Sequence, residues 1–174
     1  MKINISLQQG FTMIETLIAV AILMISIAGP LTIAQKGLTA ATYARDQVTA
    51  SFLAQDVMEY VKNVRDYNVK RANPNSLTDW LIKMDDCTFA SPCAVDTVTD
   101  TFRINPSTFV LSRDGLGYFI SGTRPSQFSR KFYIVPFTSR TRPHEVKGVV
   151  EVSWKNGTVE NVVTLENQLF NIQR

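Results

Sequence analysis

The sequence is poor in the residues that most enzymes use for catalysis and for metal binding. Its 174 residues include one histidine, His144, and two cysteines, Cys87 and Cys93. A structural zinc site takes about four thiolate or imidazole ligands, which this set does not supply. No serine or cysteine motif marks a nucleophile beside His144, and no glycine-rich phosphate loop is present. We therefore expect a protein that is not an enzyme and that holds no metal or other cofactor.

Charged residues are also sparse, at 19% of the chain with a formal net charge of +3. No dense basic tract is present, which argues against nucleic acid as a partner. A weakly basic DNA-binding surface is the alternative, formed by Arg124, Arg130, Lys131, Arg140 and Arg142. Scattered charges of this kind are more typical of a solvated surface. The same holds for four acids whose spacing does not follow an EF-hand loop, Asp85, Asp86, Asp96 and Asp100.

One long apolar run stands near the start of the sequence, from Leu17 to Ala34. It reaches the length of about 18 residues that a transmembrane helix needs, and backbone groups in lipid must be bonded within the segment. Pro30, next to Gly29, cannot donate to the helix and its ring clashes with the preceding turn. A kink or local melting is therefore predicted near Ile27 to Pro30, although a plain anchor with an incidental bend would have the same sequence.

The order of residues ahead of this run is unusual. A secretory signal has its small-residue cleavage site after the apolar segment, which is then lost. Here the candidate site, Gly10 followed by Phe11, comes first. Cleavage after Gly10 would remove residues 1–10 as a leader and leave residues 11–34 as a membrane helix.

Glu15 is an acid at the start of this apolar segment. An ionised carboxylate inside a membrane is costly and indicates a functional site. An opposite charge in correct register would offset that cost, so Glu15 could select the position of a neighbouring molecule. The alternative places Glu15 at the membrane interface, where the helix dipole stabilises it.

The stretch from Gln8 to Leu17 closely resembles the class III signal of the type IV pilin and pseudopilin superfamily. The resemblance implies that a prepilin peptidase cuts between Gly10 and Phe11 and methylates the new terminus at Phe11. It also implies that Glu15, fifth counting from Phe11, pairs with the terminal amine of a neighbouring subunit. Pilin helices often carry a proline near the position of Pro30, which implies loosening as the subunit moves from bilayer to filament.

Residues 35–72 are expected to continue the helix as an amphipathic half. Apolar residues at three- and four-residue spacings predict a packing face on residues 35–68, formed by Val48, Phe52, Leu53, Val57, Val61 and Val64. Polar residues would occupy the opposite side, namely Gln47, Gln55, Asp56, Glu59, Lys62, Asn63 and Asp66. The helix is predicted to end at about Tyr67, with Asn68 and then Asn73-Pro74 as the stop.

Residues 73–174 are expected to form the globular domain. A helical turn within Leu77 to Met84 would place Trp80 and Leu81 on the core. Cys87 and Cys93 enclose five residues, and in an exported domain this pair predicts a disulfide over the alternative of two free thiols.

The last part of the chain is rich in β-branched and aromatic residues between turn residues. The predicted strands are Thr101–Leu111, Tyr118–Gly122, Phe128–Phe137, Glu145–Lys155 and Thr158–Phe170. Asn156-Gly157 predicts a tight hairpin, because both residues tolerate positive φ. Val150, Val152 and Trp154 share one face, which the apolar stripe of the helix can cover. A long helix followed by an antiparallel sheet is an α+β fold, which is also the pilin architecture.

The hairpin Val149–Gly157 with Val162–Leu165, and the helix segment Phe52–Glu59, resemble minor pilin V proteins and the pseudopilin I class of type II secretion. The resemblance implies a structural minor pilin or pseudopilin in the inner membrane and then in an extracytoplasmic or cell-surface filament. Its implied partners are other pilin subunits, the prepilin peptidase, an inner-membrane assembly platform and membrane lipid. The alternative is a single-pass anchored extracytoplasmic domain that binds a ligand and forms no filament.

Overall fold

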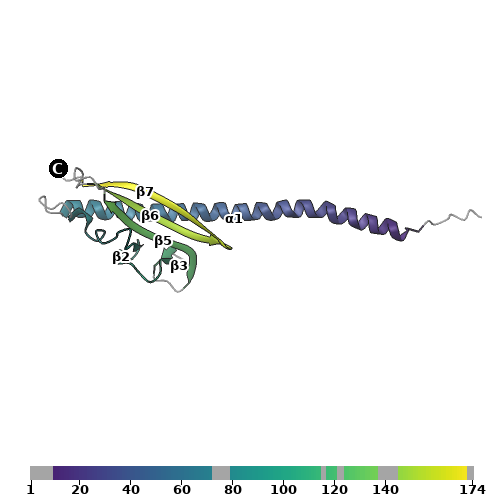
Figure 1. Ribbon diagram of the computed structural model, residues 1–174. Coiled ribbons are helices and arrows are strands. Elements are labelled where there is room, and N and C mark those ends of the chain that lie inside the picture. Colours follow the sequence, from purple (N-terminus) through teal and green to yellow (C-terminus); the bar gives the residue numbers. More distant parts are fainter. Residues whose placement is uncertain (1–9, 72–78, 115–116, 121–123, 137–144, 172–174) are drawn as a thin grey trace, which may run out of the picture. The chain divides into compact units, whose positions relative to one another are not determined.

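A computed structural model describes residues 10–71, 79–114, 117–120, 124–136 and 145–171 (Figure 1). The elements in order are α1 (Met13–Arg71), the 3-10 turn η1 (Asp79–Leu81), β1 (Cys93–Asp96), β2 (Thr101–Ile104), β3 (Val110–Asp114), β4 (Gly117–Phe119), β5 (Pro125–Pro136), β6 (Glu145–Asn156) and β7 (Val159–Phe170). The strands form one seven-stranded sheet in which every pairing between strands is antiparallel. The predicted α+β, pilin-like architecture is confirmed. The chain divides into two compact units, residues 1–44 and 45–174.

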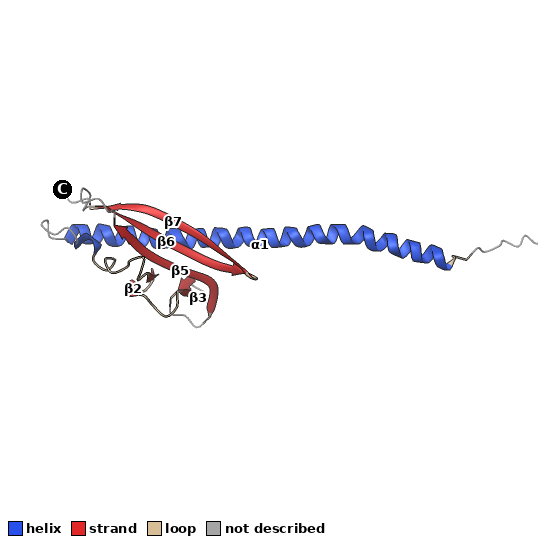
Figure 2. Ribbon diagram, viewed as in Figure 1, coloured by secondary structure: helices blue, strands red, loops and turns tan. Residues whose placement is uncertain are grey.

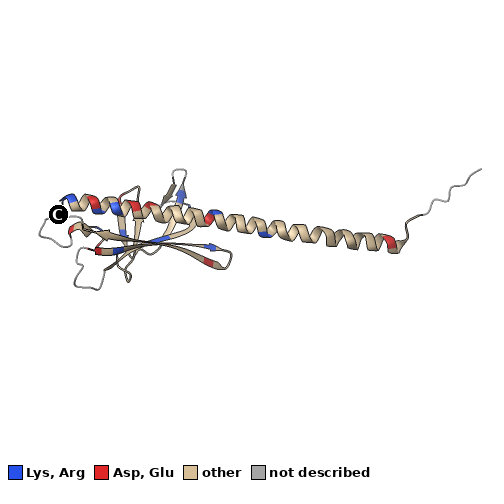
Figure 3. Cartoon of the chain, turned by 90° about the horizontal axis from the view of Figure 1, so that it is seen from above, with Lys and Arg blue, Asp and Glu red and all other residues tan. Residues whose placement is uncertain are grey.

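The first unit contains the apolar part of α1. Its most apolar window has a mean hydropathy of 2.4, and none of that window is buried in the structure. Between Glu15 and Lys36 the helix has no charged residue, as its uniform tan colour in Figure 3 shows. By length and composition α1 can therefore cross a membrane once, as the sequence predicts.

Gly29 and Pro30 lie inside α1, which continues through them without a break (Figure 2). Hydroxyl groups on both sides bond to the helix backbone: Ser26 Oγ donates to the carbonyl of Leu23 at 2.8 Å, and Thr32 Oγ1 donates to that of Ala28 at 2.9 Å. Proline removes only one backbone donor, and the turns around it stay bonded. The predicted local melting is therefore absent from this structure, and the kink stays a prediction.

In the second unit, one face of α1 is buried against the rest of the domain. Its buried residues recur at helical spacing and are Asp46, Ala50, Leu53, Ala54, Val57, Met58, Val61, Val64 and Asn68. Val48 and Phe52 were predicted on this face, but they are 55% and 65% exposed. Leu53, Val57, Val61 and Val64 are buried as predicted, and Ala50 and Ala54, which the prediction left out, are buried in addition. The buried face is therefore rotated from the predicted one.

α1 ends at Arg71, four residues beyond the predicted end at Tyr67. Asn68 was predicted as part of the stop, but it lies within the last helical turns and is buried. Its Nδ2 donates to the carbonyl of Ile82 at 2.8 Å, which joins the helix to the segment after η1. The predicted stop at Asn73-Pro74 lies outside the described residues.

β5 is the central strand of the sheet. One of its edges pairs with β6 from Phe128 to Pro136. The other edge pairs with β3 near Ser129 and with β1 at Phe132. β6 pairs in turn with β7 along their full lengths, and Val150, Val152 and Trp154 are buried as predicted.

The β6–β7 hairpin forms, but its turn is one residue later than predicted. Asn156 pairs with Val159 and is the last residue of β6, so Gly157 and Thr158 form the turn. Only Gly157, at φ 62°, has the positive φ that a tight hairpin requires. The tolerance of Asn156 for positive φ is therefore not used.

The predicted strand Thr101–Leu111 is two strands, β2 and β3. Asn105 has a φ of 42° and Pro106 has no N–H to donate, and together they interrupt the ladder. β1 was not predicted, because its four residues lie in a polar, turn-rich region. All four are buried, so β1 does not show the alternation that reveals a half-buried strand.

Residues 79–92, between α1 and β1, contribute to the core. η1 buries Trp80 and Leu81, as predicted. Cys87 and Cys93 form the predicted disulfide, with their Cα atoms 5.2 Å apart. The closed loop is joined to β5, because the N–H of Ile134 donates to the carbonyl of Cys87 at 2.7 Å. The disulfide thus holds a loop that is also bonded to the central strand.

We expect the double substitution Cys87→Ala with Cys93→Ala to lower the free energy of unfolding of the full chain in detergent by about 2 kcal/mol. The reason is that the bond closes a short loop and so removes only a modest entropy from the unfolded chain. Denaturant unfolding followed by tryptophan fluorescence measures the change. A reducing agent should destabilise the native chain to the same extent and leave the double variant unaffected. Equal stability of native chain and variant would contradict the prediction.

Candidate processing and assembly site

The three described residues before α1 are not helical. Gly10, Phe11 and Thr12 precede the helix, and Phe11 is 82% exposed. The carbonyl of Thr12 accepts hydrogen bonds from the N–H groups of Glu15 at 3.1 Å and Thr16 at 3.2 Å. Thr12 therefore occupies the N-cap position, and the bond between Gly10 and Phe11 lies outside the helix.

Gly10 is not required by the conformation of the chain. It has no positive φ, and a Cβ added there would meet no atom within 4 Å. The described fold therefore does not explain why this position is a glycine.

Glu15 lies in the first turn of α1, where the helix dipole favours a negative charge. Its side chain is exposed, and among the described residues it makes no hydrogen bond or ion pair. Glu15 is thus an acid at the beginning of an apolar helix whose charge has no partner within the described chain.

Three of the residues singled out from the sequence are close together along the chain. Gly10, Phe11 and Glu15 span the last non-helical residues and the first turn of α1. Pro30 lies four turns further along the same helix, and the disulfide belongs to the other unit. Within the described part of the chain, no group of three or more His, Cys, Asp or Glu residues could hold a metal ion.

The weakly basic DNA-binding surface, which the sequence left as an alternative, is not formed from all the residues named for it. Arg130 is only 2% exposed, so it cannot contact a ligand on the surface. Arg140, Arg142 and His144 lie outside the described residues.

Two of the acids that the sequence analysis took for solvated loop residues, Asp96 and Asp100, also have structural contacts. Asp96 is 1% exposed, and Asp100 accepts an ion pair from Lys83 at 2.9 Å.

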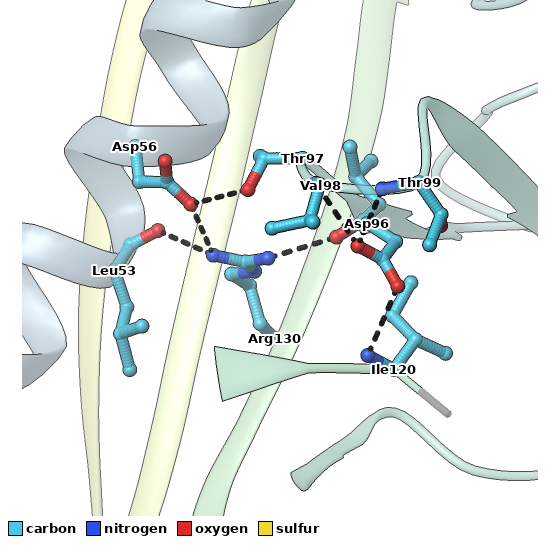
Figure 4. A network of polar contacts seen from close by, with 9 residues as sticks. Leu53, Asp56, Asp96, Thr97, Val98, Thr99, Ile120 and Arg130 are labelled. Atoms are coloured by element: carbon cyan, nitrogen blue, oxygen red, sulfur yellow. Dashed lines mark hydrogen bonds and ion pairs between the residues drawn. The ribbon is translucent and has the colours of Figure 1, made fainter. Parts of the chain in front are cut away.

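Arg130 joins the second half of α1 to the sheet (Figure 4). From β5, its Nη1 donates to the carbonyl of Leu53 and to Oδ2 of Asp56, each at 3.1 Å. Its Nη2 donates to the carbonyl of Val95 on β1 at 2.8 Å. One guanidinium group therefore bonds three elements, and the planar fork of arginine suits such divided contacts.

Asp96 organises the chain next to this contact (Figure 4). Its Oδ1 accepts the N–H groups of Val98 at 3.1 Å and Thr99 at 3.2 Å, and its Oδ2 accepts that of Ile120 at 3.4 Å. Burial by itself raises the pKa of the Asp96 carboxyl, but the hydrogen bonds from Thr99, Val98 and Ile120 outweigh it and hold the pKa below its usual value. Asp96 is therefore a buried anion stabilised by backbone donors.

Burial also lowers the pKa of the Arg130 guanidinium, against the opposing effect of the Asp56 and Asp96 carboxylates. An arginine starts from so high a pKa that it keeps its charge. The side chain of Asp56 is half exposed, whereas that of Arg130 is 1% exposed. Most of the desolvation therefore falls on the arginine, and its hydrogen bonds to buried carbonyl groups offset that cost.

We expect Arg130→Met to lower the free energy of unfolding by about 3 kcal/mol, because the carbonyl groups of Leu53 and Val95 lose a donor and Asp56 loses its partner. Chemical denaturation of the full chain in detergent, followed by the fluorescence of Trp80 and Trp154, measures the loss. Lys131→Met is the matched control on the adjacent, less buried position and should change stability by less than about 0.5 kcal/mol. Equal effects of the two substitutions would show that the contacts of Arg130 do not hold α1 to the sheet.

Comparison with protein families finds one match, to the prokaryotic N-terminal methylation motif, over residues 5–29. The matched segment contains Gly10, Phe11, Glu15 and most of the apolar run from Leu17 to Ala34. Comparison with curated proteins and with solved structures gives no significant match. The motif agrees with the class III signal expected from the sequence, and the helix-then-sheet architecture agrees with a pilin. The chain therefore carries the N-terminal signal motif that is typical of type IV pilins, and its architecture is pilin-like.

Proposed function

We propose that this chain is a structural minor pilin or pseudopilin, cleaved after Gly10 and assembled into a type IV pilus-like filament through its N-terminal helix. The observation that carries the proposal is the methylation motif at residues 5–29, which includes Gly10, Phe11 and Glu15 in one short segment. The resemblance of the β6–β7 hairpin to minor pilin V proteins and to pseudopilin I supports the minor role. The proposed partners are the prepilin peptidase, other pilin subunits and an inner-membrane assembly platform.

The local structure supports processing between Gly10 and Phe11. A peptidase must bring its catalytic groups up to the backbone, and that bond lies before the first turn of α1. The absence of a side chain on Gly10 allows this close approach, while the fold itself does not need a glycine there. Cleavage would free the amine of Phe11 at the start of the membrane helix.

The unpartnered carboxylate of Glu15 supports an assembly role. In an apolar surrounding its charge is stabilised by an opposite charge, and the methylated amine of Phe11 on a neighbouring subunit would supply one. The pair forms only when the two helices are in register. Glu15 would therefore select the position of the subunit as it leaves the inner membrane for the filament.

The competing function is that of a membrane-anchored extracytoplasmic domain. Such a domain binds a ligand and never enters a filament. Such a domain needs the apolar helix of α1 but neither the cleavage site nor the acid of the first turn. The two functions therefore differ in what happens at Gly10 and at Glu15, and both sites can be tested.

We expect a prepilin peptidase to convert the chain into a product that begins at methylated Phe11. Intact-mass analysis of protein purified from membranes of cells with and without the peptidase measures the change. The expected mass is that of residues 11–174 plus one methyl group, in peptidase-containing cells alone. Gly10→Val is the matched variant, because a side chain fits at this position without a clash and should block processing while leaving the fold intact. An uncleaved chain beginning at Met1 in both strains would overturn the pilin function and favour the anchored domain.

We expect Glu15→Ala to be processed normally and to enter filaments at least about tenfold less than the native chain, since a lost pairing of about 1.4 kcal/mol is a tenfold change in an equilibrium. Immunoblotting of sheared filaments against the membrane fraction measures the ratio. Glu59→Ala removes an exposed acid from the same helix in the other unit and should assemble normally. Normal incorporation of Glu15→Ala would exclude an assembly role for this carboxylate.

A further inference from the structure

The globular unit contains an open cleft of about 740 Å³ that has no part in the processing or assembly described above. Its walls come from the first turns of α1 in this unit, from β3 and β4, and from the beginning of β5. The volume lies within the range of about 300–1,000 Å³ that is usual for ligand sites. An edge-to-face pair of Tyr118 and Phe128, with ring centroids 5.8 Å apart, provides an apolar part of the wall.

Three arginines line this cleft: Arg45 from α1, Arg113 from β3, and Arg124 just before β5. The backbones of Arg113 and Arg124 are fixed next to each other, because the N–H of Arg113 donates to the carbonyl of Arg124 at 2.8 Å. Both side chains are exposed, and within the described residues neither makes an ion pair. The cleft thus concentrates positive charge that the described chain leaves largely unneutralised, a setting that attracts carboxylate or phosphate oxygens.

One acid lies among these arginines. The side chain of Asp46 is 7% exposed. Within the described residues its carboxylate accepts one hydrogen bond, from Nη2 of Arg45 at a long 3.4 Å. A carboxylate can accept about four hydrogen bonds, so Asp46 is a buried acceptor with most of its capacity unused. A ligand that suits the cleft therefore brings N–H donors to Asp46 as well as oxygens to the arginines.

We propose that this cleft binds an acidic peptide segment of a partner protein. Its Asp or Glu carboxylates pair with Arg113 and Arg124, and its backbone N–H groups donate to Asp46 and to the exposed amide of Gln127. A small inorganic anion has no donors to offer the buried acid and leaves most of the cleft empty. All residues that line the cleft belong to the second unit, so the same side chains are present whether or not the chain is cleaved after Gly10.

The test is a titration of the full chain in nonionic detergent with fluorescently labelled hexaglutamate, followed by anisotropy. We expect saturable binding that weakens as salt is raised. The double variant Arg113→Gln with Arg124→Gln should lose at least about tenfold in affinity, because it removes two charge-assisted contacts. The matched control, Arg103→Gln with Lys155→Gln, removes two exposed charges outside the cleft and should bind like the native chain. Circular dichroism verifies that both variants keep the fold.

Four results would overturn the proposal. One is failure of hexaglutamate to bind, and a second is equal binding by the cleft variant and the native chain. A third is binding of inorganic phosphate as tightly as the peptide through the same arginines, which would identify a simple oxyanion site. A fourth is arginine-dependent binding to phosphatidylglycerol vesicles with none to the peptide, which would assign the cleft to a lipid surface. Failure of Glu15→Ala to assemble has no bearing on any of these results.

Discussion

The charge on Arg130, buried between α1 and the sheet, is the interaction on which the second unit depends. An arginine removed from water needs acceptors for its donors, and here Nη1 and Nη2 find them on α1 and β1, whereas Nε has no partner among the described residues. The position of α1 along its own axis is therefore fixed relative to β5, because Leu53 and Asp56 must lie beside Arg130. Valine and alanine side chains in the same interface would tolerate small shifts along the helix, whereas three directed hydrogen bonds do not.

The N-terminal part of the chain could be predicted well, because its structure depends on local sequence. The apolar run determines the helix by itself, and the order of Gly10, Phe11 and Glu15 needs no distant contact to be recognised. The β6–β7 hairpin is local in the same sense, since a glycine between two β-branched runs defines it. Even there the turn was displaced by one residue, because the strand pairing extends through Asn156.

The parts that could not be predicted depend on contacts between distant residues. Arg130 was taken for a surface charge, and nothing in its neighbours along the chain shows that Asp56 and Val95 will surround it. β1 is buried on every residue, so it has no alternating pattern. The rotation of the helix face away from Val48 and Phe52 follows from which side of α1 meets the sheet, a property of the packed domain. The arginine cleft likewise gathers residues 45, 113 and 124, which are far apart in sequence.

The bond from Arg130 to the carbonyl of Leu53 also has a mechanical meaning. α1 is a single helix from Met13 to Arg71, so tension applied near its beginning is carried along the helix by its own backbone. Part of it passes to β5 through the bonds of Arg130 to Leu53 and Asp56, and the rest is carried by the buried face of α1 between Asp46 and Asn68. The load is thus shared between directed bonds and packed side chains along the second half of the helix.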